Sequence, residues 1–250
     1  MLTVLKKIVL TLNFALIFIA GIKVSAGTVN LNDGLILNYQ FEGNLLDSSV
    51  NQLHGVLAND GRITAVSGKD NNSKSVYVSG AVNHETPTNF QIGNKYGAIS
   101  EYLDGAKSIT LSFWIKKTAE VSEDTNIFKI YCGESTTGIY ATYGSGANKG
   151  NIQFGSRATV NDMMIKSKWV SGADLNRWIH FVVSFNYENY SLQVVTNGDV
   201  VNMQSNHTVW FNTSYENGNK ISGYGQTEAD YISTANCIFD DFRIYNRPLS

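Results

Sequence analysis

Apolar and polar residues alternate along most of this chain. The clearest run is Ser108–Ile115, in which Ile109, Leu111, Phe113 and Ile115 share one face. Period-two spacing that is rich in β-branched and aromatic residues is typical of a strand with one buried face. Similar runs occupy Leu35–Phe41, Ser75–Ser79, Asn126–Tyr131, Gly138–Tyr143, Asn151–Phe154, Trp178–Asn186, Ser191–Thr196 and Ile238–Tyr245. The pattern predicts an all-β protein.

Turn-forming residues separate these runs. Asn197-Gly198-Asp199 lies between two apolar runs and predicts a tight hairpin, whereas Gly144–Gly150 and Asn212–Gly225 predict surface loops. After the N-terminal segment we find no sustained 3.6-residue period, no internal repeat and no linker rich in Pro or Ser. Residues 27–250 are therefore expected to form one domain, and many short strands joined by turns are typical of a sandwich or jelly roll.

The first 26 residues resemble a secretory signal peptide. Lys6 and Lys7 precede an apolar run, Ile8–Ile22, and Val24-Ser25-Ala26 forms a small-residue cleavage site. The alternative is a membrane anchor, but a run of about 15 residues is short of the roughly 20 that a span needs. No Cys lies near Ala26, which argues against a lipoprotein anchor. We expect a secreted protein (periplasmic or on the cell surface if the source is bacterial) with no membrane insertion after cleavage.

Removing residues 1–26 takes away three lysines and no acid. Of the 19 basic and 21 acidic residues, 16 basic and 21 acidic ones remain, which gives a net charge of −5. Phosphate-backbone binding needs a basic patch, and no run of Lys and Arg is present. Nucleic acid is therefore excluded as the expected partner.

The two cysteines, Cys132 and Cys237, could form a disulfide bond in an exported protein. The bridge would close a loop of about 100 residues and could contribute roughly 4 kcal/mol. The alternative is two separate buried thiols, and spacing alone does not decide between them.

Five motifs occur in a characteristic order. They are Leu37–Asn44 with Leu45–Ser49 and His54-Gly55, then Ser75–Gly80, Ser108–Ile115, Asn176–Phe185 with Val194–Gly198, and Ile238–Ser250. In this order they resemble the laminin-G-like domains of the concanavalin A-like lectin/glucanase superfamily. Val50 and Gln52 depart from the family pattern, which often has Gly there, and Lys166–Asp174 is an atypical insert. The resemblance implies a two-sheet antiparallel jelly roll, a fold that hosts lectins, glycanases, adhesion modules and hormone-binding domains.

The resemblance also implies that the first and last strands are neighbours and that a structural calcium can lie near them. Calcium prefers six to eight oxygen ligands. The candidates are Glu42, Asn44, Asp47, Asp240 and Asp241. Strand alternation predicts that Asp240 and Asp241 point to opposite faces, so only one would be a ligand. The alternative is that Asp47 caps a turn and that Asp240 pairs with Arg243 or Arg247.

Aromatic side chains are the candidates for sugar binding, because their faces stack on the apolar faces of sugars. Four lie in polar, loop-like surroundings and are expected to be exposed: Trp169, Trp210, Tyr215 and Tyr224. Ordinary loop packing is the alternative for these four. Trp114 and Trp178 lie in predicted core strands, and we expect them to pack inside.

Catalytic signatures are absent from the sequence. Superfamily glucanases carry Glu-x-Asp-x-Glu on one strand, whereas Glu228-Ala229-Asp230 has two of these acids and predicts a polar loop. The histidines, His54, His84, His180 and His207, form no His-x-x-x-His pair, and His180 is expected to be an ordinary strand residue. Glycosylation sequons begin at Asn71, Asn189, Asn206 and Asn212.

The sequence therefore predicts a non-catalytic extracellular binding module whose partner is a glycan. The alternatives are an adhesion or structural domain that binds a cell-surface protein, and a glycoside hydrolase with an unfamiliar acid pair.

Overall fold

The computed structural model describes residues 30–57, 62–70, 72–79, 89–94, 98–103, 106–120, 125–131, 138–157, 164–166, 170–171, 175–186, 191–204, 231–233 and 237–249. The chain divides into two compact units, residues 1–31 and 32–250. The fold described below belongs to the second unit. Within the described residues, no helix is both long and apolar enough to span a membrane.

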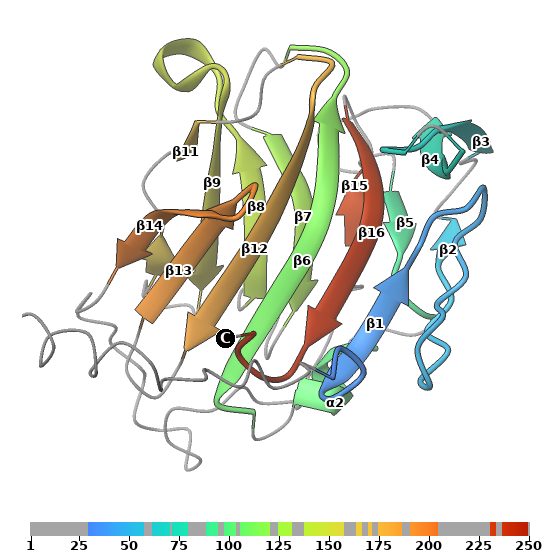
Figure 1. Cartoon of the computed structure of the whole chain (residues 1–250), viewed down its shortest axis with the longest axis horizontal. Coiled ribbons are helices and arrows are strands. Elements are labelled where there is room, and N and C mark those ends of the chain that lie inside the picture. Colours follow the sequence, from blue (N-terminus) through green and yellow to red (C-terminus); the bar gives the residue numbers. More distant parts are fainter. Residues whose placement is uncertain are drawn as a thin grey trace, which may run out of the picture. The chain divides into compact units, whose positions relative to one another are not determined.

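Two antiparallel sheets form the molecule, as predicted (Figure 1). Sheet A has the order β14 (Asp199–Gln204), β13 (Ser191–Thr196), β12 (Trp178–Asn186), β6 (Ser108–Lys117), β16 (Cys237–Tyr245), β4 (Lys74–Ser79) and β3 (Arg62–Ser67), and β1 (Leu35–Tyr39) also pairs with β16. The first and last strands are thus neighbours, as the resemblance implied.

Sheet B lies behind sheet A in Figure 1. Its order is β10 (Met164–Lys166), β9 (Asn151–Arg157), β8 (Gly138–Tyr143), β7 (Thr125–Tyr131), β15 (Tyr231–Ser233), β5 (Asn89–Gln91) and β2 (Val56–Leu57), and β11 (Val170–Ser171) also pairs with β9. A short helix, α2 (Ser100–Leu103), and a 3₁₀ turn, η1 (Gly146–Asn148), complete the described elements.

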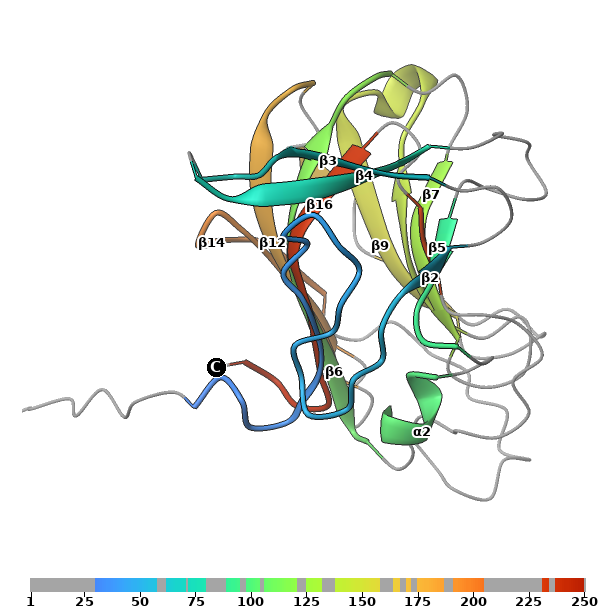
Figure 2. The same ribbon diagram turned by 90° about the vertical axis from the view of Figure 1, so that its right-hand side faces the viewer.

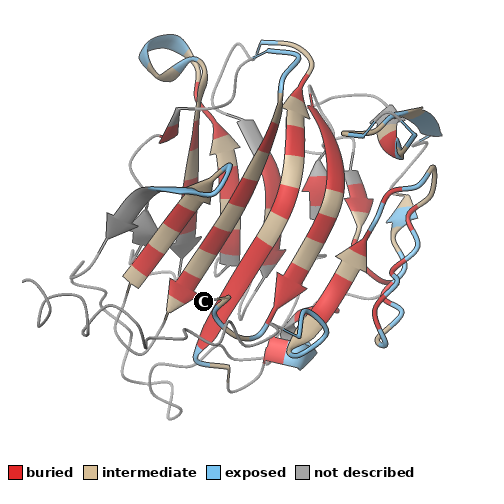
Figure 3. Cartoon of the chain, in the orientation of Figure 1, coloured by how far each residue is buried: buried red, intermediate tan, exposed pale blue. Residues whose placement is uncertain are grey.

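Alternation of buried and half-buried residues, along β12 and over Leu111–Lys117 of β6, builds the core between the sheets. On β12 every second residue from Ile179 to Phe185 is buried, and Figure 3 shows the resulting bands on β6 and β12. Phe113 of β6 lies at the centre of this core. Its ring centroid is within 5.5 to 6.2 Å of five other phenylalanine rings, those of Phe128, Phe154, Phe181, Phe239 and Phe242.

The hairpin predicted at Asn197-Gly198 is confirmed. Thr196 pairs with Asp199, which leaves these two residues as the whole loop. Asn197 has a φ of 50° and Gly198 a φ of 93°, the left-handed backbone that a two-residue hairpin loop requires and that Asn and Gly adopt at little cost.

A β-bulge in β16 changes which side chains face the core. The pairing of β16 with β6 shifts register between Asp240 and Arg243, and Asp241 has a φ of 47°. An extra residue in one strand breaks the two-residue alternation. Phe239 and Phe242, three positions apart, therefore both pack on Phe113.

Replacing Phe113 with Ala is expected to destabilise the fold by about 3–5 kcal/mol, because it removes the ring that five others contact. Phe113→Leu is the matched control and should cost less, since it retains most of the side-chain volume. Urea unfolding followed by tryptophan fluorescence measures both. Equal, small losses for the two variants would contradict the central place given to Phe113.

Candidate functional site

The outer face of sheet A carries the candidate site. Because Phe113 and Ile179 point into the core, their strand neighbours Trp114, Trp178 and His180 point outward, and all three are half-buried. Figure 2 shows sheet A edge-on, with the β3–β4 hairpin and β14 extending on the side of this outer face. Two hairpins thus flank a surface of aromatic and polar side chains.

Trp114 and His180 form the centre of this surface. They are register partners on β6 and β12, and their rings stack with centroids 4.9 Å apart and an interplanar angle of 28°. The Nε2 atom of His180 lies 3.0 Å from Ser112 Oγ, a hydrogen bond whose donor depends on the tautomer. Lys69 Nζ lies 5.8 Å from the centroid of the Trp114 ring. We call Trp114, His180, Ser112 and Lys69 the Trp114 cluster.

The β16 bulge holds Lys69 beside Trp114. Asp240 Oδ2 accepts a hydrogen bond from the Lys69 backbone N–H at 2.9 Å, and Asp241 Oδ2 lies 3.3 Å from Lys69 Nζ. Both aspartates therefore serve the same loop, so the expectation that they point to opposite faces is wrong. The bulge is the physical reason, because it interrupts the alternation between them.

Close packing of the β3–β4 turn on β16 depends on a glycine. A Cβ atom at Gly68 would lie 2.8 Å from Asp240 Oδ2, closer than side-chain carbons approach other atoms. Gly68 therefore lets the Lys69 backbone reach the Asp240 carboxylate. The same hairpin has a shallow, open depression whose lining residues are Ala65, Val66, Ser67, Asn72, Ser73 and Lys74.

Charged neighbours complete the surface. Lys69 Nζ also contacts Asp70 Oδ2 at 2.5 Å, and this hydrogen bond is the main reason that the pKa of Lys69 is raised. Arg243 Nη2 lies 3.5 Å from Asp241 Oδ1.

Burial shifts the pKa values of two other groups on this surface. It raises the pKa of Asp240, a residue that is only 2% exposed. Burial lowers the pKa of His180, although Asp241 opposes that shift.

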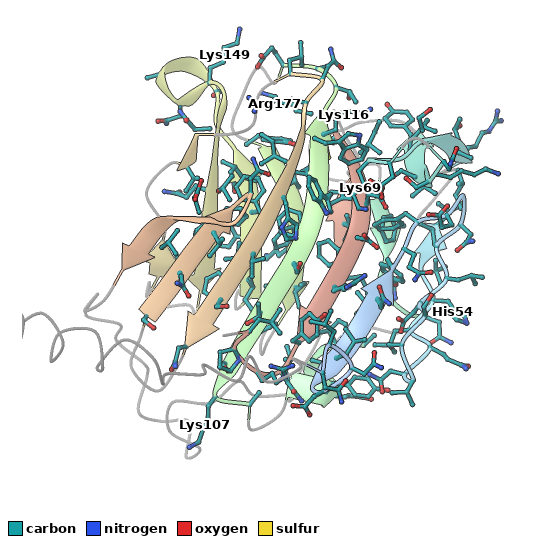
Figure 4. All side chains as sticks on the ribbon, in the orientation of Figure 1. His54, Lys69, Lys107, Lys116, Lys149 and Arg177 are labelled. Atoms are coloured by element: carbon teal, nitrogen blue, oxygen red, sulfur yellow. The ribbon has the colours of Figure 1, made fainter. Side chains whose placement is uncertain are left out.

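A second aromatic–cation pair lies beside the Trp114 cluster. Lys116 and Trp178 are register partners on β6 and β12, two pairs further along the strands than Trp114 and His180 and therefore on the same face. Lys116 Nζ lies 4.9 Å from the Trp178 ring centroid. Figure 4 labels Lys69 and Lys116, which lie toward the same end of sheet A, while Lys107 lies at the other end.

The expectation that Trp114 and Trp178 pack in the core is wrong. The residues that fill the core are their neighbours Phe113 and Ile179. The signal was present in the sequence, because the alternation that assigns Phe113 to the buried face assigns Trp114 to the opposite one. His180 is a strand residue, as predicted, but it belongs to the same outer surface.

The four aromatic residues predicted to bind sugar, Trp169, Trp210, Tyr215 and Tyr224, lie outside the described residues. So do the acids Glu228 and Asp230 and the four sequon asparagines, Asn71, Asn189, Asn206 and Asn212. These assignments stay predictions.

The proposed calcium ligands do not gather into one cluster. Asp47 accepts four hydrogen bonds at 2.7 to 2.8 Å, from the backbone N–H groups of Asn38, Ser49 and Leu53 and from the Ser49 hydroxyl. Its bond to the Ser49 N–H closes the turn, the alternative considered for this residue. Both carboxylate oxygens are thus engaged inside the segment between β1 and β2, which leaves Asp47 poorly suited to a metal.

The other candidates have partners of their own. Glu42 Oε2 accepts from the Lys74 backbone N–H at 2.9 Å, and Asn44 Oδ1 accepts from the Leu46 N–H at 2.9 Å. The cations predicted to pair with Asp240 have other partners, since Arg243 contacts Asp241 and Arg247 contacts Asp33. Across the described ranges, no three His, Cys, Asp or Glu side chains are grouped as a metal would need. A structural calcium stays a prediction.

Cys237 is fully buried at one end of the sandwich. It pairs with Lys117, whose Nζ lies 5.1 Å from the Tyr143 ring centroid, and burial raises the pKa of the Cys237 thiol. Cys132 lies outside the described residues. The residue before it, Tyr131, pairs with Gly138 at one end of β7. At the other end of β7, Thr125 pairs with Tyr143. The disulfide bond stays a prediction.

The folded state should become less stable as the pH is lowered from 7.5 to 5, because His180 is harder to protonate in the folded state. The folded state holds its pKa below the ordinary value of 6.5, so the unfolded state binds the proton more readily as the pH falls. The stabilisation is complete above pH 6.5 and is lost as the pH falls through the folded pKa. Melting temperatures of the wild type and His180→Gln at both pH values measure the effect. The drop should be smaller in the variant, and equal drops would contradict this role.

If the predicted structural calcium binds, the melting temperature rises when calcium is added, because an ion that binds the folded state stabilises that state. Thermal unfolding of the purified protein with excess calcium and with excess chelator measures the difference. An unchanged melting temperature would remove calcium from the account.

Comparison with known proteins agrees with this architecture. The family model described as "Concanavalin A-like lectin/glucanases superfamily", of the Laminin_G_3 type, matches residues 93–250. No curated protein matches the sequence.

Solved structures share the fold at low sequence identity. Domain 4 of AbnA, an extracellular arabinanase of Geobacillus stearothermophilus solved with arabinotriose, has a TM-score of 0.57 and 18% identity, over 86% of this chain and 94% of that one. The binding domain of botulinum neurotoxin DC with rat synaptotagmin II has a TM-score of 0.54 and 16% identity, over 88% of this chain. A structure of botulinum neurotoxin type C, whose cell entry depends on interaction with two ganglioside molecules, has a TM-score of 0.54 and 17% identity, over 89% of this chain.

This chain spans about half the length of the two neurotoxin chains, since 50% of each is covered. Identities below 20% show the shared fold and leave the ligand to be argued from this chain's own side chains. The fold and the match over more than half of the sequence agree, and the chain belongs to the concanavalin A-like lectin/glucanase superfamily.

Proposed function

We propose that this protein is an exported, non-catalytic module that binds carbohydrate on the outer face of sheet A, at the Trp114 cluster. The observation that carries the proposal is the stacked pair of Trp114 and His180, bordered by Ser112 and Lys69. A sugar ring has apolar C–H faces and a rim of hydroxyl groups. An aromatic face beside fixed hydrogen-bonding groups is complementary to both.

Rigidity of the surface supports this proposal. Trp114 and His180 lie on central strands of an eight-stranded sheet, and their strand neighbours are locked in the phenylalanine core. Binding groups on rigid strands lose little conformational freedom when a ligand binds. The arabinanase domain solved with arabinotriose and the neurotoxin linked to gangliosides are proteins of this fold with sugar ligands.

The arrangement of acids favours binding over hydrolysis. Glycoside hydrolysis needs one carboxyl group to donate a proton and another to act as base or nucleophile. Asp240 is buried and accepts from a backbone N–H, and Asp241 contacts both Lys69 and Arg243. Asp240 and Asp241 therefore have structural partners, and we assign them to holding the Lys69 loop.

A protein partner is the second candidate function, and one observation favours it. Leu46 and Val50 are 53% and 89% exposed on the segment that the Asp47 hydrogen bonds hold rigid. Apolar side chains displayed on an ordered segment can contact another protein. The botulinum neurotoxin DC binding domain solved with synaptotagmin is a protein of this fold with such a partner.

Replacing Trp114 with Ala is expected to weaken glycan binding by at least about tenfold, because the stacking face is lost. A glycan array with the purified wild type selects the ligand, and calorimetry measures the affinity of each variant. Tyr102→Ala is the matched control, since Tyr102 is an exposed aromatic residue on α2, which lies away from the outer face of sheet A (Figure 2). Its affinity should equal that of the wild type.

Three results would contradict the proposal. An array with no glycan bound would favour the protein partner, and equal affinity of the two variants would exclude the Trp114 cluster. Release of reducing ends from a polysaccharide panel would show a hydrolase.

A further inference from the structure

Lys116 has a charge that no carboxylate balances among the described residues. Its ammonium group is 4.9 Å from the Trp178 ring centroid, and its side chain is half-buried on the outer face of sheet A. Its register partners are Trp178 on β12 and Ile238 on β16, which is only 7% exposed. The immediate neighbours are therefore aromatic and aliphatic.

The carboxylates on the neighbouring elements have other partners. Asp240 on β16 accepts the Lys69 backbone N–H. Glu120 contacts Lys117 Nζ at 2.7 Å and Lys149 Nζ at 4.0 Å, and the Lys117 hydrogen bond is the main reason that the pKa of Glu120 is lowered. Asp241 is shared between Lys69 and Arg243. The described part of the chain places no acid within ion-pair distance of Lys116.

Lys116 therefore differs from the other lysine of this surface. Lys69 is held by Asp70 and Asp241, so its charge is already balanced. A cation against an aromatic face keeps much of its attraction for an anion, because the ring carries no net charge. An anionic group beside Trp178 would gain a charge-assisted hydrogen bond without displacing a protein partner.

We propose that the glycan bound on this face is acidic, with a carboxylate or sulfate of the sugar paired to Lys116 while the ring stacks on Trp114 or Trp178. This inference rests on the proposed function and assigns Lys116 as the residue that determines specificity. The mature chain has a net charge of −5, so an acidic polymer is repelled by the protein as a whole. The positive charge of Lys116 is then the local feature that favours binding of an acidic glycan.

The test compares matched acidic and neutral ligands. Calorimetry measures binding of oligogalacturonate and of the same oligomer after carboxyl reduction, and a second arm compares dextran sulfate with dextran. We expect an acidic form to bind about tenfold more tightly than its neutral partner, with a preference that falls as salt is raised. The arm that shows the preference identifies the anion as carboxylate or sulfate.

Variants separate the charge of Lys116 from its packing. Lys116→Gln should lower affinity for the acidic form about tenfold and leave the neutral form unchanged, and Lys116→Arg should retain the preference. Lys107→Gln is the matched control at the other end of sheet A, where no change is expected (Figure 4).

Each outcome decides between the inference and the function on which it rests. Equal affinity for acidic and neutral forms, or a loss in Lys116→Gln that is the same for both, would overturn the inference. If the neutral form still binds and Trp114→Ala abolishes that binding, the proposed function stands and only the inference about Lys116 fails. If none of the four ligands binds and the glycan array is also empty, both fail.

Discussion

The contact on which the rest of this structure depends is the packing of phenylalanine rings between the two sheets. Phe113 on sheet A touches rings from β7 and β9 of sheet B as well as from β12 and β16 beside it. Side-chain packing of this kind fixes the orientation of every strand that contributes to it. Because Phe113 and Ile179 must point inward, Trp114, Lys116, Trp178 and His180 must point outward. The candidate site is thus a direct consequence of the core.

Polar groups at the edge of the sandwich shape what surrounds that site. The Asp47 carboxylate organises the segment between β1 and β2 through four hydrogen bonds, so an acid that resembles a metal ligand in the sequence acts as a structural anchor. The β16 bulge turns Asp240 and Asp241 toward one loop, and that loop brings Lys69 to Trp114. Buried carboxylates are retained where such hydrogen bonds offset the cost of removing them from water.

Two aromatic–cation pairs on one rigid sheet give the surface its chemical character. In the Trp114 cluster the cation is balanced by aspartates, whereas Lys116 beside Trp178 is balanced by none in the described structure. In our proposal, the first arrangement receives a sugar ring and the second pairs with its anionic group. Both follow from side chains at fixed positions on neighbouring strands.

The sequence by itself determined the local features: period-two alternation identified the strands, Asn197-Gly198 identified the hairpin, and five ordered motifs identified the family. It also contained the outward placement of Trp114, since alternation alone assigns that face. Only the tertiary structure decided the pairing of Asp47 with backbone donors, the bulge that unites Asp240 with Asp241, and the isolation of Lys116 from every described acid. The Asp47 donors lie within nine residues of it, and the fold of that segment decided which of them it meets. The other two features depend on contacts between residues far apart in the chain, as between Lys69 and Asp240, and no local pattern encodes such contacts.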